Sequence, residues 1–210
     1  MNLKVALIFG ASGLVGSHCL QELLLNSNYG KVIAFTRRSL GISHPKFVEV
    51  IIDFNSLDDI AHTLVGDDLF YCMGSTLKKA GSQQEFRKID LNYPLSIATI
   101  AAKNGVKKWI MVSSVGASKS ATSFYLRVKG EAEYSISTLG FQEIHFFRPS
   151  LLLGERAEHR IAESLGKSVM RLLSPIMVGA LKKLRPVEAS RVANEMVVVA
   201  QSCSPGINIH

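Results

Sequence analysis

Three side chains in the middle of the sequence have types and a spacing suited to proton transfer at a carbonyl group. Tyr125 and Lys129 are four residues apart in a segment expected to be helical, so both lie on one helix face. A phenol, with an ordinary pKa near 10, exchanges protons poorly at neutral pH unless a cation favours its ionised form, and Lys129 would supply that cation. Ser114 ends a strand and would hydrogen-bond the carbonyl oxygen, with Ser113 as second choice because successive strand residues face opposite ways. We therefore take Ser114, Tyr125 and Lys129 as candidate catalytic residues.

A glycine-rich turn near the start of the chain has the spacing of a phosphate-binding turn for a dinucleotide. An apolar segment expected to be a strand, residues 4–9, leads directly into it, and a helix is expected to follow. Glycines here allow positive φ and close backbone approach, while the amide groups at the start of the helix meet the phosphate charge. The expected cofactor contacts are the residues of this turn: Gly10, Ser12, Gly13, Leu14, Val15 and Gly16.

Two arginines follow the second expected strand, where a protein that prefers NAD would usually carry an acidic residue for the ribose hydroxyls. Arg37 and Arg38 would instead clamp a 2'-phosphate through charge-assisted hydrogen bonds. The sequence therefore favours NADPH over NAD. The plainer interpretation, two solvated arginines in a loop, stays open.

Two further strand ends are expected to touch the cofactor. Asp53 and Phe54 follow the third strand, where the adenine edge of a Rossmann-bound cofactor lies. Met73 and Gly74 follow the fourth, and the glycine would let the backbone pass close to the ribose and phosphates. A simple turn at Gly74 is the alternative. Tyr125 and Lys129 are also expected cofactor contacts, because the Lys129 ammonium would hold the nicotinamide ribose.

The alternation of strand-like and helical segments predicts a Rossmann-type, doubly wound α/β fold: a parallel sheet with helices on both faces. The expected strands are residues 4–9, 32–36, 47–51, 69–72, 109–113 and 144–147. Long helices are expected at 83–104, kinked or split by Pro94, at about 123–138, and from Pro186 to about 201. We expect one domain, 1–210, in which residues 155–186 form an insertion that acts as a substrate region or lid.

Taken together, these residues resemble the short-chain dehydrogenase/reductase superfamily, in its extended and atypical branch. The chain looks most similar to the small Tat-interacting-protein-like oxidoreductases, through residues 36–38 (Thr-Arg-Arg), 113–114 (Ser-Ser), 125–130 (Tyr-Leu-Arg-Val-Lys-Gly) and 147–149 (Phe-Arg-Pro). The resemblance implies a nicotinamide cofactor and hydride transfer. It also implies that backbone near Leu151 and Leu152 meets the nicotinamide and that Arg160 reaches a cofactor phosphate.

Composition limits the other classes of function. The net charge is +7 and the isoelectric point about 9.4, but the basic residues are scattered, so no nucleic-acid partner is expected. The six histidines lack metal-ligand spacing, and no metal is expected. Three separated cysteines, taken as buried or half-buried thiols, and the lack of an export signal predict a cytoplasmic protein. Segment 167–185 mixes apolar and basic residues, which suits a substrate lid or, less favoured, a membrane surface or partner protein.

The sequence therefore predicts an NADPH-dependent reductase of a small carbonyl substrate. Two alternatives remain open: an NADPH-binding sensor with little turnover, and a nucleotide-sugar epimerase-like enzyme that recycles its cofactor.

Overall fold

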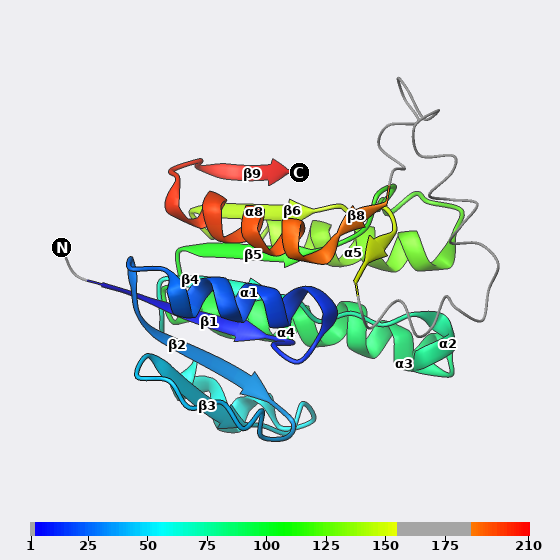
Figure 1. Cartoon of the computed structure of the whole chain (residues 1–210). Helices are drawn as coiled ribbons and strands as arrows, with labels where there is room; N and C mark the ends of the chain where they lie inside the picture. The colour runs from blue at the N-terminus through cyan, green and yellow to red at the C-terminus, as the bar shows by residue number, and fades with distance from the viewer. Residues whose placement is uncertain (1–2, 155–185) are drawn as a thin grey trace.

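A seven-stranded parallel sheet organises the part of the chain that the structure, a computed structural model, describes: residues 3–154 and 186–210 (Figure 1). The strand order is β3-β2-β1-β4-β5-β6-β9. The strands are β1 (Lys4–Phe9), β2 (Tyr29–Thr36), β3 (Phe47–Ile51), β4 (Asp68–Tyr71), β5 (Lys108–Val112), β6 (Glu143–Phe147) and β9 (Gly206–Ile209). The predicted Rossmann-type α/β fold is confirmed.

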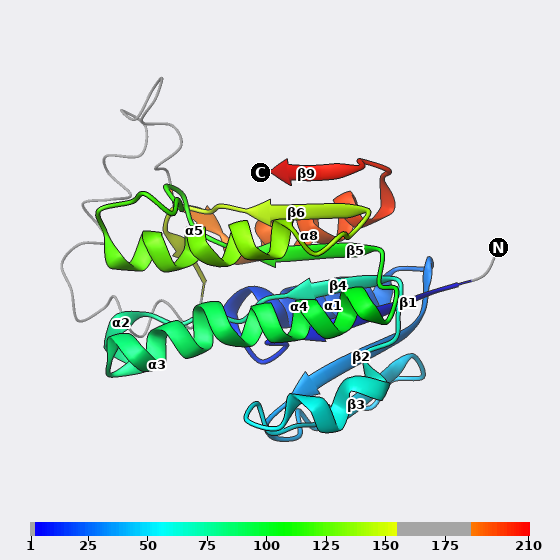
Figure 2. The ribbon, with the colours of Figure 1, turned by 180° about the vertical axis from the view of Figure 1, so that it is seen from behind.

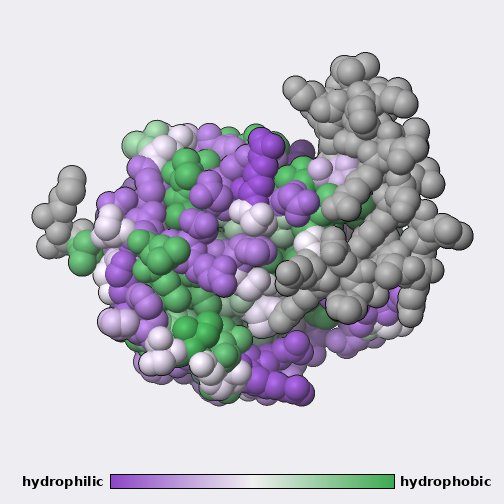
Figure 3. All heavy atoms as spheres, in the orientation of Figure 1, coloured by the Kyte–Doolittle hydropathy of each residue, from purple (hydrophilic) through white to green (hydrophobic). Residues whose placement is uncertain are grey.

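Helices cover both faces of this sheet. On the face shown in Figure 1 lie α1 (Leu14–Leu25) and α8 (Ala189–Gln201), which pack against each other. On the face shown in Figure 2 lie α2 (Leu77–Ala80), α3 (Gln83–Arg87), α4 (Tyr93–Lys103) and α5 (Phe124–Ser137), and a 3-10 helix, η1 (Leu57–Thr63), packs against α4. None of the helices in the described ranges is long and apolar enough to cross a membrane. Hydrophilic side chains cover much of the α1/α8 face, with smaller apolar areas between them (Figure 3).

Strand β1 shows why the central strands are almost continuously apolar. Ala6 and Ile8 pack into the core under α1 and α8, whereas Leu7 and Phe9 pack into the core on the α4/α5 side. All four are fully buried. A strand covered on both faces offers no position for a polar side chain, and this pattern made the sheet predictable.

The expected long helix after residue 82 forms with an altered turn in its middle. It begins as predicted, since Ser82 accepts a hydrogen bond from the Glu85 amide at 3.1 Å. Residues Lys88–Asn92 then form a π-helical turn, η2, in which the Tyr93 amide donates to the Lys88 carbonyl. Pro94 has no N–H and its ring would clash with the carbonyl four residues earlier, so a wider turn lets the helix continue.

Three short strands were not predicted. Strand β9 adds to the edge of the sheet beside β6, and β7 (Leu152–Leu153) pairs with β8 (Val187–Glu188) in a separate two-stranded sheet. Each has at most four residues, too few for a clear period-2 pattern. Residues 155–185, which carry the expected lid, Arg160 and the 167–185 segment, lie outside the described residues.

Polar side chains at the amino end of the sheet fasten α8 to the strands. The Tyr29 hydroxyl donates to Asp68 at 2.6 Å, and Gln201 donates to the Tyr29 hydroxyl at 3.0 Å. The Lys4 ammonium pairs with Asp68 at 3.0 Å and donates to the Ala200 carbonyl at 2.9 Å. A cation is favourable at a helix C-terminus, so these charges stabilise the docking of α8.

Candidate functional site

The glycine turn brings the end of β1, the start of α1 and the end of β4 into close contact. Gly10 has φ +82°, and its carbonyl accepts a hydrogen bond from the Gly13 amide at 2.8 Å. A Cβ atom on Gly10 would lie 2.8 Å from backbone atoms of Cys72 and Met73, and one on Gly16 only 2.1 Å from the Gly10 oxygen. Only glycine fits at these two positions without moving the backbone.

Within the described residues, the first amide groups of α1 have no side-chain cap. Gly13 is the N-cap residue and offers no side-chain cap, and the first turn contains no acidic residue. The amides of Leu14, Val15 and Gly16 therefore point beyond the helix end, where the positive end of the helix dipole also lies. Ser12 is exposed beside them. This arrangement fits the pyrophosphate of a dinucleotide.

Arg37 and Arg38 are both exposed and lie immediately beyond the end of β2. Their loop is held by Glu49 of β3, a residue that sequence reasoning missed. Its carboxylate accepts hydrogen bonds from the Leu40 amide at 2.8 Å and the Thr36 hydroxyl at 3.2 Å. Hydrogen bonds from Ser39, Leu40 and Thr36 lower the pKa of Glu49, so it stays ionised. The loop thus presents both arginines on a fixed support.

The two candidate residues in the loop after β3, Asp53 and Phe54, differ in exposure. Asp53 is exposed and uses one carboxylate oxygen to accept from the Asn55 amide and side chain, both at 2.9 Å. Phe54 is buried, with its ring 5.1 Å from Tyr93 and 6.4 Å from Phe9. Its side chain is thus part of the core, which leaves its backbone for a cofactor contact.

A buried ion pair joins α5 to the turn before α4. The Lys129 ammonium lies 2.7 Å from Asp90, and the two side chains are 4% and 0% exposed. The second Asp90 oxygen accepts from the Ser75 amide at 2.9 Å. A Cβ on Gly74 would lie 3.4 Å from both partners, so the loop after β4 passes directly over the pair.

The charge of Lys129 depends on this partner. Burial lowers the pKa of Lys129, but the Asp90 carboxylate, with Tyr125 and Glu133, outweighs burial and raises it overall. The ammonium is therefore charged and fixed in position at neutral pH. Asp90 was missed from the sequence because a single acid between Ile89 and Leu91 matches no motif, although a charge flanked by two apolar residues of a helix is itself a signal.

Tyr125 lies one helical turn before Lys129 on α5 and is half-buried, with its ring packed 5.3 Å from that of Phe86. The four-residue spacing within α5 places both side chains on one face of the helix, and Tyr125 is among the groups that raise the pKa of Lys129. The predicted pair therefore does come together on one face of α5.

The two serines at the end of β5 lie in different environments. Ser113 is buried, and its hydroxyl has no hydrogen-bond partner among the described residues. Ser114 is half-buried, and its hydroxyl is 3.4 Å from the Val115 carbonyl. The accessible hydroxyl is that of Ser114, and its catalytic role stays a prediction.

Two more motif residues hold α5 in place. A Cβ on Gly130 would lie 2.2 Å from backbone of Ser118, so the loop that follows Ser114 crosses α5 at this glycine. Arg148 forms a two-point ion pair with Glu133 of α5, with one contact of 3.0 Å from Nε. Both contacts fix the position of Tyr125 and Lys129 relative to the sheet.

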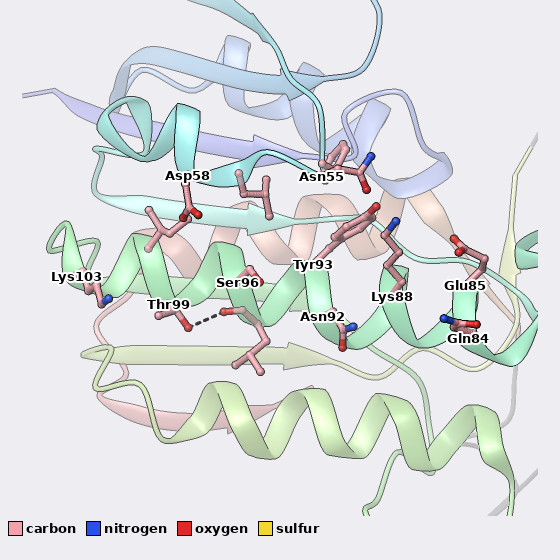
Figure 4. Close-up of a pocket in the computed structure, with 14 residues that line it drawn as sticks. Asn55, Asp58, Gln84, Glu85, Lys88, Asn92, Tyr93, Ser96, Thr99 and Lys103 are labelled. Atoms are coloured by element: carbon pink, nitrogen blue, oxygen red, sulfur yellow. Dashed lines mark hydrogen bonds between the residues drawn. The ribbon is translucent and has the colours of Figure 1, made fainter.

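A separate groove of about 740 Å³ runs between η1 and the α3–α4 helix (Figure 4). Asn55, Lys88 and Tyr93 lie at its centre, and Phe54 also lines it. Ser114, Tyr125 and Lys129 are not among its described lining residues, so this groove is not the predicted catalytic site.

The remaining candidate residues lie in varied surroundings. Met73 is half-buried beside the glycine turn, and Leu152 lies half-buried in β7.

The expectation that all three thiols are buried or half-buried is wrong for Cys203, which is exposed. The reason is that Cys203 follows the end of α8 and does not lie within the sheet. Among the described residues no group of three or more histidine, cysteine or acidic side chains is arranged to hold a metal ion.

Known proteins share both the sequence and the fold. Residues 10–161 match a family of proteins described as NAD(P)H-binding. Protein HTATIP2 of Rattus norvegicus is 37% identical over 80% of this chain and 70% of its own length, and the mitochondrial protein FMP52 of Candida albicans is 32% identical over 96% and 88%. The enzyme WbmH of Bordetella bronchiseptica, solved with NAD+, superposes with a TM-score of 0.73 at 16% identity, covering 98% of this chain and 75% of that one.

The relatives correct one expectation. FMP52 proteins of Candida albicans and Aspergillus niger are named mitochondrial, which contradicts the cytoplasmic location inferred from the sequence. Free thiols indicate only a compartment in which thiols stay reduced, and they do not distinguish one such compartment from another.

The sequence match extends across the glycine turn, the Arg37–Arg38 loop and the Tyr125–Lys129 pair, and the solved structure shares the parallel sheet that positions them. These findings confirm the resemblance to atypical short-chain dehydrogenases and reductases. The chain belongs to the NAD(P)H-binding family.

Proposed function

We propose that this protein is an NADPH-dependent reductase of small carbonyl compounds. The observation that carries the proposal is the buried Lys129–Asp90 pair, one helical turn from Tyr125 and directly beneath the loop at Gly74. A charged ammonium fixed beside a half-buried phenol, at the carboxyl end of a parallel sheet, is suited to proton transfer at a bound substrate.

Each residue would have a distinct role. The amides of the glycine turn would hold the pyrophosphate, and a bound reduced nicotinamide would supply hydride to the carbonyl carbon. Ser114 would donate a hydrogen bond to the carbonyl oxygen, and Tyr125 would give that oxygen its proton, which completes the alcohol. Lys129 would favour the phenolate that remains, and Asp90 would act as the positioning residue for Lys129.

Replacement of the phenol tests the proposal directly. Tyr125→Phe should lower kcat for NADPH-dependent reduction by about 10² to 10⁴-fold, because the proton donor is lost. The ring and its packing against Phe86 remain, so NADPH affinity and the free energy of unfolding should stay close to those of the wild type. A panel of aldehydes, ketones and quinones, followed by NADPH absorbance, provides the measurement.

Tyr134→Phe is the matched control, because Tyr134 is on the same helix, is 55% exposed and should not affect turnover. If Tyr125→Phe reduced the same substrate at the wild-type rate, the proposed role of Tyr125 would be wrong.

The cofactor preference rests on Arg37 and Arg38. The double variant Arg37→Ala/Arg38→Ala should weaken NADPH binding by at least about tenfold, since each hydrogen bond to a charged group contributes about 1.5–3 kcal/mol. NADH lacks the 2'-phosphate, so its affinity should change little. Calorimetric titration of both cofactors gives the result, and Lys31→Ala, which removes an exposed cation from β2 ahead of the arginine loop, is the control. Equal affinities of the wild type for NADPH and NADH would contradict the preference.

One alternative is favoured by the structural comparison. Another similar solved structure is the UDP-N-acetylglucosamine 4-epimerase of Methanobrevibacter ruminantium, with a TM-score of 0.73 at 16% identity, covering all of this chain and 77% of that one. An epimerase-like enzyme would retain tightly bound NAD through purification, and a sensor would bind NADPH without reducing any carbonyl in the panel. Extraction and identification of the bound nucleotide therefore separates the epimerase-like enzyme from the reductase, and the carbonyl panel separates the sensor from the reductase.

A further inference from the structure

Strand β9 forms one edge of the sheet, and no described strand pairs with its outer side (Figures 1 and 2). It runs parallel to β6, with Ile207 beside Ile144 and Ile209 beside Phe146. The amides of Gly206 and His210 donate to carbonyls on the β6 side, at 2.9 and 3.0 Å. Because backbone groups alternate along a strand, those of Ile207 and Ile209 point away from β6, toward the open edge.

The side chains of these two isoleucines are also unusually exposed for their type. Ile207 is 54% and Ile209 58% exposed, and they share the sheet face that α5 partly covers. Between them and α5 lies a hollow of about 450 Å³, lined by Phe146, Tyr134 and other residues. The edge therefore combines exposed apolar side chains with backbone donors and acceptors that no described strand pairs with. Native sheets usually pair or cover an edge of this kind.

We propose that β9 pairs antiparallel with β9 of a second copy of this chain, about a two-fold axis at Asn208. In that register Ile207 faces the partner's Ile209 and Ile209 faces the partner's Ile207, and each opposed pair exchanges two backbone hydrogen bonds. The four isoleucines then form one apolar cluster between the two α5 helices, and the two sheets become continuous. This proposal is independent of the chemistry proposed for Tyr125 and Lys129.

The sequence of the strand favours a second copy over an unrelated peptide. The two residues that flank Asn208 are both isoleucine, so this apolar face complements itself under two-fold symmetry. The residue on the axis meets its own copy, and Asn208 is neutral, which avoids like-charge repulsion. At the opposite edge of the sheet, β3 has the charged Glu49 at its centre, a feature that discourages edge pairing.

A disulfide trap tests the register. In a Cys203→Ser background, Asn208→Cys should form disulfide-linked dimers under mild oxidation. Asn208 and its copy would form a non-hydrogen-bonded pair, because the Asn208 backbone groups face β6. The Cα atoms of such a pair lie about 4.5 Å apart, within the range of roughly 4.4–6.8 Å that disulfides span. Ile209→Cys is the matched control, because two copies of residue 209 would lie diagonally, about 8 Å apart, too far for a disulfide.

Equal cross-linking of both variants would show random collision and overturn the proposal, and so would the absence of cross-linking for Asn208→Cys. Light scattering across a range of concentrations provides a second measurement. The wild type should show dimers that Ile207→Asp/Ile209→Asp lacks, while the unfolding temperature of the dilute proteins stays similar because both side chains are exposed. A wild type that remains monomeric at every concentration would overturn the proposal and point to a different partner for this edge.

Discussion

Gly16→Ala is expected to weaken the binding of both NADPH and NADH by about 100-fold, equivalent to the loss of one or two charge-assisted hydrogen bonds. The added Cβ would lie 2.1 Å from the oxygen and 2.7 Å from the carbon of the Gly10 carbonyl. Both are backbone atoms, so the turn itself must move, and with it the amides that face the pyrophosphate. The strain should also lower the free energy of unfolding by about 1–3 kcal/mol.

Gly105→Ala separates binding from stability. Gly105 has φ +81°, so alanine there is strained by about 1–2 kcal/mol, yet its Cβ would meet no atom within 4 Å and the residue lies at the end of α4. This variant should lose stability and keep its cofactor affinity. If Gly16→Ala bound NADPH as tightly as Gly105→Ala, the turn would not be the phosphate site. Fluorescence titration and chemical denaturation measure the two quantities.

Asp90→Asn should have the largest effect on stability, a loss of about 3–5 kcal/mol at pH 7, because it leaves the Lys129 ammonium buried without an opposite charge. Turnover should fall as well, because Lys129 loses the group that holds it charged and in position. The double variant Asp90→Asn/Lys129→Met removes both charges and should recover much of the stability without recovering turnover. Failure of the second replacement to restore any stability would contradict an unpaired charge as the cause.

The pH dependence of Asp90→Asn gives an independent test of the same pair. In the wild type the pKa of Lys129 is raised, so the stability it contributes is fully present below its unfolded pKa and is lost only as pH rises through the folded value. In Asp90→Asn burial dominates and the folded pKa falls below the unfolded one. The variant should therefore gain stability between pH 7 and pH 10, relative to the wild type. Urea unfolding across this range measures the difference, and parallel profiles would contradict the argument.

Much of the fold could be predicted because its signals act over a few residues. The bounds of β1 and β3 match the predicted segments. Strand β1 is a continuous apolar run because both of its faces are buried, and β3 is short and rich in β-branched and aromatic residues. The start of α3 is fixed by its own capping residue, Ser82. Strand β9 was missed because it is short, and its strand structure depends on pairing with β6, which lies far away in the sequence.

Other features could be located from the sequence only in part. Pro94 indicated a disturbance in the long helix but not whether it would be a kink, a break or a wider turn, and only the packing of η2 on α5 brings Asp90 to Lys129. Phe54 was expected at the cofactor, yet its ring enters the core beside Phe9 and Tyr93. Apolar residues at strand ends serve core and ligand alike, and only packing decides between them.

The sequence by itself determined the features that are local. The glycine turn was recognised from the spacing of its glycines after an apolar strand, although Gly10 also meets the distant backbone of Cys72 and Met73. Tyr125 and Lys129 share a face of α5 because of helical spacing alone. The tertiary structure decided which acid neutralises Lys129, which serine at the end of β5 is accessible, and that Glu49 supports the arginine loop. Those contacts join segments that meet only when the strands pair and the helices pack on the sheet, and no pattern within either segment specifies its partner.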